Sequence, residues 1–558
     1  MKKLLVLIMS FLILFSCTKK PSENEMTSKE FLDSLTLIVE PLYIQMSQAY
    51  WDATASGKDK YYDLYANLDI QLTKIFSNTE DFQKVKTFRE KGEISDPILT
   101  RELEVAYYHF LSNQADTSLL KKITELSTKV EKNFNTFRGK IDGKPVTGND
   151  ISDILKTSND LELRKKAWEA SKQVSTLVEA DMLKLAKLRN ESAKAMGFDN
   201  YYQLRLVVNE QVPDKLLKLF DELDQETRAP FIEIKHEMDS VLASRFNINI
   251  EDLRPWHYAD PFFQSAPVIT EIKLDPYYAD KDIVKLVADF YKSIGIDVEP
   301  ILSRSDLYER KGKYPHAYCT NIDRKGDVRI MTNVRPTEEW AGTVLHELGH
   351  AIYEIYIDND LPFALREPSH IFTTEAVAMF LGRLSKNAKW MQEMIDISDE
   401  EREKITEATW KTLRLEQLIF SRWVQVMVHF EKSLYENPDQ DLNKLWWEHV
   451  EKYQMVKRPE ERYIPDWATK IHICSVPVYY HNYMLGEMLA SQFLFAIAKS
   501  QYLDSIDEIK FVGNPEIGKY FIENIFKPGN KYRWDEMIIR ATGEKLTAKY
   551  FVKQFGSK

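Results

Sequence analysis

Apolar residues recur at steps of three and four along most of the chain, which is the period of an amphipathic helix. Phe31, Leu35 and Ile38 follow this spacing near the start of the chain. Similar stretches occupy residues 100–135, 160–205, 213–245 and 400–455. The pattern therefore predicts a mainly α protein whose helical body begins at about Glu30.

The helical pattern is interrupted between residues 250 and 336, a stretch that holds seven prolines. Within that stretch Asp327 to Met331 alternates between polar and apolar residues, as a short edge strand does. We find no internal repeat and no low-complexity linker that would divide the chain. The sequence thus predicts one large helical domain over residues 30–558, with a small strand element shortly before residue 336.

The composition agrees with a helical domain and excludes several classes of protein. Only 18 of 558 residues are glycine, 44% are hydrophobic and 29% are charged, which excludes disorder, collagen-like repeats and a polytopic membrane protein. A net charge of −11 without a basic block argues against nucleic acid as a partner. Three cysteines are too few for a disulfide scaffold.

The first residues have the features of an export signal. Lys2 and Lys3 precede an apolar run that is too short to span a bilayer and ends in Ser16-Cys17. This ending resembles the lipobox of bacterial lipoproteins, in which the cysteine carries the lipid. We expect a signal peptide (1–16), a lipid-anchored tether (17–29) and an exported cell-envelope lipoprotein, on the periplasmic side or cell surface, touching the membrane only through Cys17. The alternative is a plain signal peptide with an incidental cysteine.

The main chemical signal is the pentapeptide His346-Glu347-Leu348-Gly349-His350. Thr337 can cap the helix that leads into it. Two histidines four residues apart lie on one helix face and can converge on a single Zn²⁺, with Glu347 beside them as general base for a water molecule. The alternative is a helix with two surface histidines that bind no metal.

A catalytic zinc needs a third protein ligand. Glu375 lies 25 residues past His350 within a second helical pattern, and its neighbours Phe372 and Phe380 are apolar. An unpaired carboxylate there would be strongly destabilising, and a metal would remove that penalty. His370 is a rival ligand, ranked second because it lies among loop-like residues. The sequence predicts one zinc ion bound by His346, His350 and Glu375.

Two further segments hold histidines that could act on a substrate. One runs from Pro315 to Cys319 and contains His316; the other runs from Lys470 to Tyr483 and contains His472. The second segment could equally be a polar interface between helices. The two body cysteines, Cys319 and Cys474, could form a disulfide or remain free thiols, and their spacing does not decide between these.

Together these motifs resemble the angiotensin-converting-enzyme family of zinc peptidases, in a bacterial lipoprotein form. The resemblance covers residues 280–490: a helix (IVKLVADFYKSIGI), then His316 thirty residues before His346, a short strand, HELGH, DLPFALRE and a Lys-x-His…Val-Pro…Tyr segment, in the family's order. It implies a helical domain with a deep central cleft that hydrolyses oligopeptides and releases dipeptides from their C-termini.

The resemblance also implies a role for each residue. Glu347 would activate water and pass the proton to the leaving amine, while His472 and Tyr483 would stabilise the oxyanion. The remaining residues would bind the substrate, its backbone by His316 and by Ala317 on the strand, and its C-terminal carboxylate by Lys470 and Tyr480.

The sequence departs from the family pattern at several positions. One extra residue between His472 and Tyr483 leaves the roles of Tyr479, Tyr480 and Tyr483 open. Asn482 replaces an arginine, which puts chloride activation in doubt, and Met379 replaces an aspartate that would orient a zinc histidine. The glutamine that helps to bind the carboxylate has no evident counterpart.

Three other functions remain open. HELGHAIYE also fits the thimet-type oligopeptidases and the thermostable-type zinc carboxypeptidases, although Tyr353 stands where the thimet-type motif has a further histidine. A non-catalytic peptide-binding lipoprotein is the third. It would be expected to have lost Glu347 or a zinc ligand, and all of them are present. The sequence does not indicate an oligomeric state.

Overall fold

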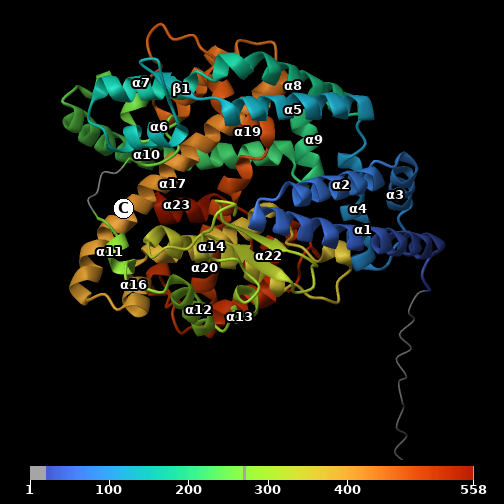
Figure 1. Ribbon diagram of the computed structural model, residues 1–558. Coiled ribbons are helices and arrows are strands. Elements are labelled where there is room, and N and C mark those ends of the chain that lie inside the picture. Colours follow the sequence, from blue (N-terminus) through green and yellow to red (C-terminus); the bar gives the residue numbers. More distant parts are fainter. Residues whose placement is uncertain (1–19, 268–271, 557–558) are drawn as a thin grey trace, which may run out of the picture.

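The computed structural model describes residues 20–267 and 272–556 and is mainly helical (Figure 1). The helices of the first half are α1 (Glu23–Ser56), α2 (Asp59–Phe76), α3 (Thr79–Lys91), α4 (Pro97–Ser112), α5 (Thr117–Thr136), α6 (Gly148–Thr157), α7 (Leu161–Lys172), α8 (Ser175–Ala195), α9 (Tyr201–Val208) and α10 (Pro213–Phe246). The later helices are α11 (Asp275–Tyr278), α12 (Ile283–Ser293), α13 (Glu299–Leu302), α14 (Glu338–Ile355), α15 (Ile371–Gly382), α16 (Ala388–Ile395), α17 (Asp399–Glu436), α18 (Leu442–His449), α19 (His472–Ser475), α20 (His481–Ser500), α21 (Pro515–Phe521), α22 (Trp534–Thr542) and α23 (Lys549–Phe555).

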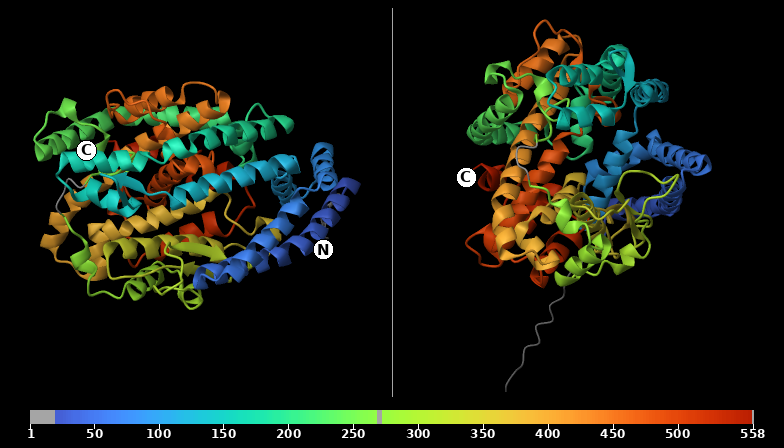
Figure 2. Two further views of the ribbon diagram at one scale, coloured as in Figure 1. Left: turned by 45° about the horizontal axis from the view of Figure 1, so that its top comes forward. Right: turned by 60° about the vertical axis from the view of Figure 1, so that its left-hand side comes forward.

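The helices form two halves that α17 joins. In Figures 1 and 2 helices α5 to α10 lie together in one half, and α11 to α16 lie with α20 and α22 in the other. Helix α17 packs against α10 and α18 as well as against α16 and α20. Most residues in the second half of this long helix are buried, among them Trp423 and Phe430. The mainly α prediction is confirmed.

The predicted strand is present, with a partner that the sequence pattern did not identify. Strand β4 (Val328–Met331) pairs antiparallel with β3 (Tyr318–Asn321), so that Tyr318 lies opposite Met331. On its other side β4 forms a parallel bridge between Met331 and Asp306, so among the described strands β3 has an edge with no partner. A second small sheet, β1 (Gly139–Ile141) and β2 (Lys144–Val146), lies far from this one in the chain.

The helical body begins earlier than its hydrophobic pattern indicates. Helix α1 starts at Glu23 because the Ser22 side chain caps it, accepting a hydrogen bond from the Glu25 amide at 2.9 Å. Residues 23–29, predicted to be part of the tether, are therefore helical. The predicted signal peptide (1–16) and Cys17 lie outside the described residues.

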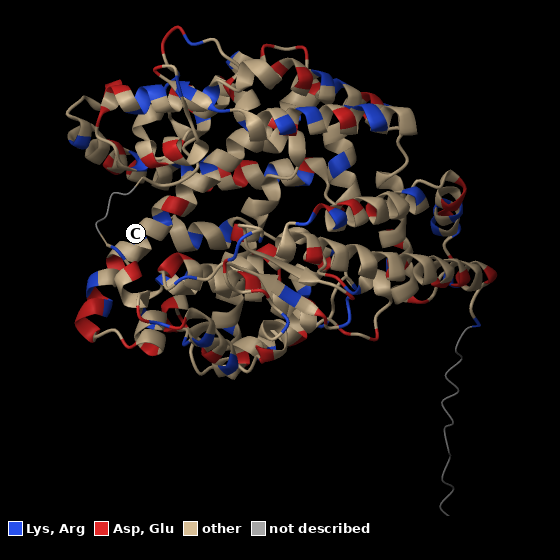
Figure 3. Ribbon diagram, viewed as in Figure 1, with Lys and Arg blue, Asp and Glu red and all other residues tan. Residues whose placement is uncertain are grey.

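The described surface carries both signs of charge. Figure 3 shows Lys and Arg interspersed with Asp and Glu along the helices of both halves. Among the described residues, no helix combines the length and apolar character that crossing a membrane requires.

Candidate active site and metal centre

The predicted HELGH motif lies in the middle of helix α14, where its side chains are fixed by packing. The Thr337 hydroxyl caps this helix, accepting a hydrogen bond from the Trp340 amide at 3.3 Å. Val344, Leu345 and Leu348 are fully buried and hold the helix against the core. As a result His346 and His350 point from one face, one helical turn apart.

Helix α15 crosses α14 at very close range, and this crossing brings the third predicted ligand to the histidines. A Cβ atom added to Gly349 would lie only 2.8 Å from the Cα of Ala378. Glycine at the centre of the motif therefore permits the two backbones to approach. Glu375, one turn before Ala378, comes to lie beside both histidines as a consequence.

His346, His350 and Glu375 form the one group of three or more metal-ligating side chains found among the described residues. The two histidine Nε2 atoms are 3.2 Å apart, and the Glu375 Oε2 atom lies 3.8 Å from His346 Nε2 and 3.9 Å from His350 Nε2. Ligands held about 2.0–2.1 Å from a tetrahedral zinc are roughly 3.3 Å from each other. These side chains therefore fit a zinc ion, and the fourth position is left for water or substrate.

The orientation of the ligands is fixed without the aspartate that Met379 replaces. The Nδ1 atom of His350 is hydrogen-bonded to the Thr374 hydroxyl at 2.7 Å, and the backbone carbonyl of Ala378 bonds to His346. Burial lowers the pKa of His346 to about 4 and that of His350 to about 3. Both imidazoles are therefore neutral at physiological pH, which is the form that binds a metal.

Glu347 lies beside this group in a nearly dry position. It is 7% exposed, and burial, reinforced by the nearby charge of Glu375, raises the pKa of its carboxyl group to about 8. A cation bound by the neighbouring ligands would oppose this shift. The carboxyl group is thus suited to exchanging a proton near neutral pH.

A buried polar group surrounds Lys470 and includes a glutamine, Gln264, that the sequence analysis did not single out. The Lys470 ammonium donates to Gln264 Oε1 at 2.8 Å, and the Tyr480 hydroxyl donates to the same oxygen at 3.4 Å. Lys470 and Tyr480 are each 6% exposed. Gln264 comes from a proline-rich loop more than 200 residues earlier, so no local motif could have identified it. We call Gln264, Lys470 and Tyr480 the lysine cluster.

The tyrosines of the same segment divide between two environments. Tyr480 belongs to the lysine cluster and also accepts a hydrogen bond from Trp423 Nε1 at 2.8 Å. Tyr479 and Tyr483 lie close enough to Glu375 for its charge to raise the pKa of each, in addition to the effect of burial. The ring centres of Tyr480 and Tyr483 are 5.3 Å apart, so Tyr483 lies between the lysine cluster and the charge of Glu375.

The other candidate histidines occupy different settings. The His472 ring packs against Tyr480, and its buried Nδ1 atom has no hydrogen-bond partner among the described residues. His316 is exposed in front of β3, and its ring contacts Tyr314; Ala317 immediately precedes that strand. His370 caps α15 and bonds to the Asn209 carbonyl at 3.1 Å, apart from the metal-binding group.

The structure resolves the question left open for the two cysteines and shows the surroundings of Asn482. Cys319 and Cys474 are both free thiols. Asn482, which replaces an arginine, is buried and accepts a hydrogen bond from Gln211 Nε2 at 2.9 Å. An amide pair therefore occupies the position of the family's arginine.

The helical fold, the close crossing of α14 and α15 and the His-His-Glu group with its adjacent glutamate define the class of HExxH metallopeptidases. The sequence model of peptidase family M3 matches residues 154–557, and the chain belongs to this family. A second model, described as angiotensin-converting enzyme, matches residues 22–231, where the sequence carried no diagnostic motif. The protein is thus a zinc metallopeptidase.

Curated relatives agree with both matches. The chain is 22% identical over 593 residues to an angiotensin-converting enzyme of Theromyzon tessulatum, covering 97% of this chain and 92% of the relative. It is 22% identical to an angiotensin-converting enzyme of Haematobia irritans exigua, over 73% and 72% of the two chains. It is 25% identical to organellar oligopeptidase A of Arabidopsis thaliana, over 32% of this chain and 29% of the relative.

Proposed function

We propose that the protein removes dipeptides from the free C-termini of oligopeptides. The observation that carries this proposal is the lysine cluster, which places a buried ammonium group and two polar side chains next to the metal centre. A buried lysine without an ion-pair partner is costly, and a substrate carboxylate would compensate it. A peptide bound there by its C-terminus would extend along Tyr480 and Tyr483 toward Glu375.

The residues of the metal centre provide the rest of the chemistry. Zinc, which His346, His350 and Glu375 would bind, polarises the scissile carbonyl group and lowers the pKa of water. Glu347 takes the proton from the attacking water and returns it to the leaving amine. Tyr483 and His472 donate hydrogen bonds to the developing oxyanion, and His316 and Ala317 align the substrate backbone along the free edge of β3.

Cleavage within longer peptides is the second candidate function. The name of the Arabidopsis relative favours it, and so does the family M3 match across the whole catalytic region. The two functions differ in whether they need the lysine cluster, because cleavage inside a peptide does not require a C-terminal carboxylate to be bound.

We also propose that Cys17 is lipidated and that the enzyme acts outside the cytoplasm. This rests on the basic start, the apolar run and the Ser16-Cys17 ending. Metabolic labelling with a radioactive fatty acid tests it. Label in the wild-type protein but not in a Cys17→Ser variant supports the anchor, and absence of label from both excludes it.

The experiment for the activity uses zinc analysis and mass spectrometry of the products. The zinc-loaded enzyme is given matched peptides with free and amidated C-termini. Dipeptides released from the free peptides alone support the proposal. Single residues would identify a carboxypeptidase, and internal cuts in both peptides an oligopeptidase. A Glu347→Gln variant that retained full activity would contradict the proposed role of Glu347.

A further inference from the structure

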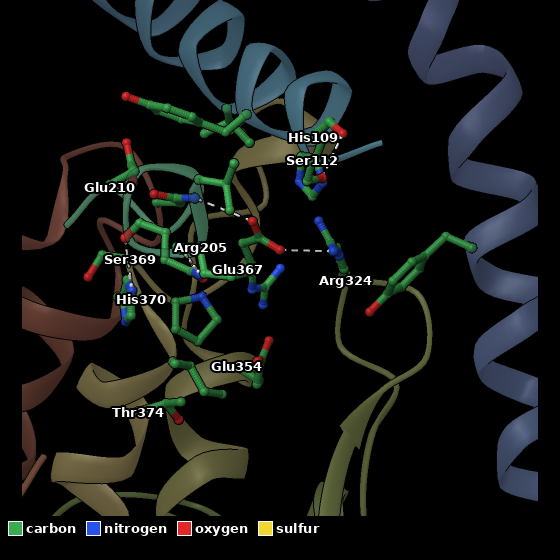
Figure 4. Close-up of a pocket in the computed structure, with 18 residues that line it drawn as sticks. His109, Ser112, Arg205, Glu210, Arg324, Glu354, Glu367, Ser369, His370 and Thr374 are labelled. Atoms are coloured by element: carbon green, nitrogen blue, oxygen red, sulfur yellow. Dashed lines mark hydrogen bonds and ion pairs between the residues drawn. The ribbon is translucent and has the colours of Figure 1, made fainter. Parts of the chain in front are cut away.

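A cavity of about 470 Å³ adjoins the metal centre and has charged walls (Figure 4). It lies between α4, α9, α14, α15 and the loop that joins β3 to β4. Thr374, whose hydroxyl is hydrogen-bonded to His350, lines the cavity, and so does Glu354 of the zinc helix. No residue of the lysine cluster lines it. Its size is that of a small-molecule or side-chain pocket.

Most of the acidic groups on the cavity walls are already neutralised. Glu367 forms an ion pair with Arg324 at 2.9 Å, and Glu210 is held by the guanidinium of Arg101 at 2.8 Å. Figure 4 shows the pair of Glu367 and Arg324 across the upper part of the cavity. These carboxylates are therefore structural and are not available to a ligand.

Glu354 is the exception. Its carboxylate accepts a hydrogen bond from Asn321 Nδ2 at 3.0 Å, but it forms no ion pair among the described residues. Burial raises the pKa of Glu354 to about 7; Asn321 and Arg324 oppose the shift and Glu367 reinforces it. Arg205 also lines the cavity, and among the described residues it forms no ion pair with Glu354. A cation placed in the cavity would thus compensate a half-buried carboxylate that Asn321 and Arg324 compensate only in part.

The position of Glu354 indicates which part of a substrate it would meet. It follows His350 by four residues on the same helix face, which corresponds to about 6 Å along the helix axis. Two residues of an extended peptide span about 7 Å. With the C-terminus on the lysine cluster and the scissile bond at the metal centre, the second residue on the amino side of that bond reaches Glu354.

We infer that Glu354 forms a cation-selective site that binds a positively charged group on the second residue before the cleaved bond, either a lysine or arginine side chain or a free α-amino group. This inference rests on the proposed function. A hydrogen-bonded ion pair at a half-buried site favours the charged substrate by about tenfold or more.

The test compares acetylated tetrapeptides that differ only at their first residue, which is lysine, norleucine or glutamate. A fourth peptide has norleucine and a free amino group. For the zinc-loaded wild-type enzyme we expect one of two results. Either kcat/KM is about tenfold higher or more for the acetylated lysine peptide than for the acetylated norleucine peptide, or it is about tenfold higher or more for the norleucine peptide with a free amino group than for its acetylated form. The first result identifies the side chain and the second the α-amino group. Equal values throughout, or a preference for glutamate, overturn the inference.

Variants assign the preference to Glu354. In Glu354→Gln the ratio should fall to about one, whereas Glu339→Gln, which removes a charge from the exposed start of the same helix, should keep the wild-type ratio. An unchanged ratio in Glu354→Gln overturns the assignment. If that variant does not fold, Glu354→Asp keeps the charge but draws it back from the ligand, and its ratio should be intermediate.

A binding measurement separates this inference from the proposed function. The zinc-loaded Glu347→Gln protein is titrated calorimetrically with the lysine and norleucine peptides. About tenfold tighter binding of the lysine peptide supports the cation site even if none of the peptides is cleaved by the wild-type enzyme. Equal affinities contradict it even if all are cleaved.

Discussion

Lys470 is a cation held in an apolar setting, and its charge state determines what it can bind. The rings of Phe262, Trp423 and Tyr480 surround it, each about 5 Å from the ammonium group. Burial lowers the pKa of Lys470 to about 8, although the nearby Asp260 opposes the shift. The ammonium group is therefore charged below about pH 8 and loses its charge above it.

This shift predicts a pH dependence that is specific to substrates with a free C-terminus. For such peptides kcat/KM should fall as the pH rises through about 8, because the neutral amine no longer attracts the carboxylate. Amidated peptides provide the control: they lack the carboxylate, so their kcat/KM should be low at both pH 7 and pH 9 and should not show this fall. A decline of equal size for both kinds of peptide would mean that another group titrates.

Tyr483 and Tyr479 both face Glu375, and substitution distinguishes their roles. Loss of one oxyanion donor reduces kcat by about 10²–10³-fold. We expect Tyr483→Phe to show this loss with little change in KM, and Tyr479→Phe to change kcat by less than tenfold. Steady-state kinetics of the two variants measures these changes in kcat and KM. A reversal of the two results would assign the oxyanion to Tyr479.

At the scale of elements, the metal centre depends on how closely two helices cross. Helices α14 and α15 approach through Gly349, and α20 approaches α15 through Gly486, whose added Cβ would lie 3.4 Å from the side chain of Glu375. A sequence with few glycines therefore has two of them at the crossings that set the position of a metal ligand. The crossings explain why these helix-interior glycines are present despite their low helix propensity.

Gly349→Ala should weaken both the fold and the metal site. The added methyl group would meet backbone atoms of Ala378, and overpacking of this kind costs about 1–3 kcal/mol. We expect a lower melting temperature and weaker zinc binding, measured by thermal unfolding and by competition with a chelator. The matched control is Gly148→Ala, where an added Cβ has no neighbour within 4 Å and should be neutral or slightly stabilising.

At the scale of the whole molecule, α17 connects the half that contains α10 to the half that contains the metal centre. Its strongest polar link is Arg422, 2% exposed, which pairs with Asp224 of α10 and also donates to Thr227. The lysine cluster and the metal ligands come from different segments around this framework, so their relative position depends on it.

Arg422→Ala should destabilise the protein by about 3–5 kcal/mol, because it leaves the carboxylate of Asp224 buried with fewer partners. Denaturant unfolding measures the loss. Lys411→Ala removes an exposed ion pair with Glu407 from the same helix and should cost no more than about 1 kcal/mol. Equal effects of the two substitutions would show that the buried pair contributes nothing beyond a surface pair.

The sequence by itself determined the helical class and predicted that His346, His350 and Glu375 would lie together, as the structure shows, because helical period and ligand spacing are local properties of the chain. It could not reveal Gln264, which reaches Lys470 from more than 200 residues away, or Thr374 and Ala378 as the groups that orient the histidines. It also left open the roles of Tyr479, Tyr480 and Tyr483, since one inserted residue changes the direction in which each of them points at the start of α20. Only the tertiary structure decided these positions, because side chains meet where helices cross, and a crossing depends on the packing of the whole core.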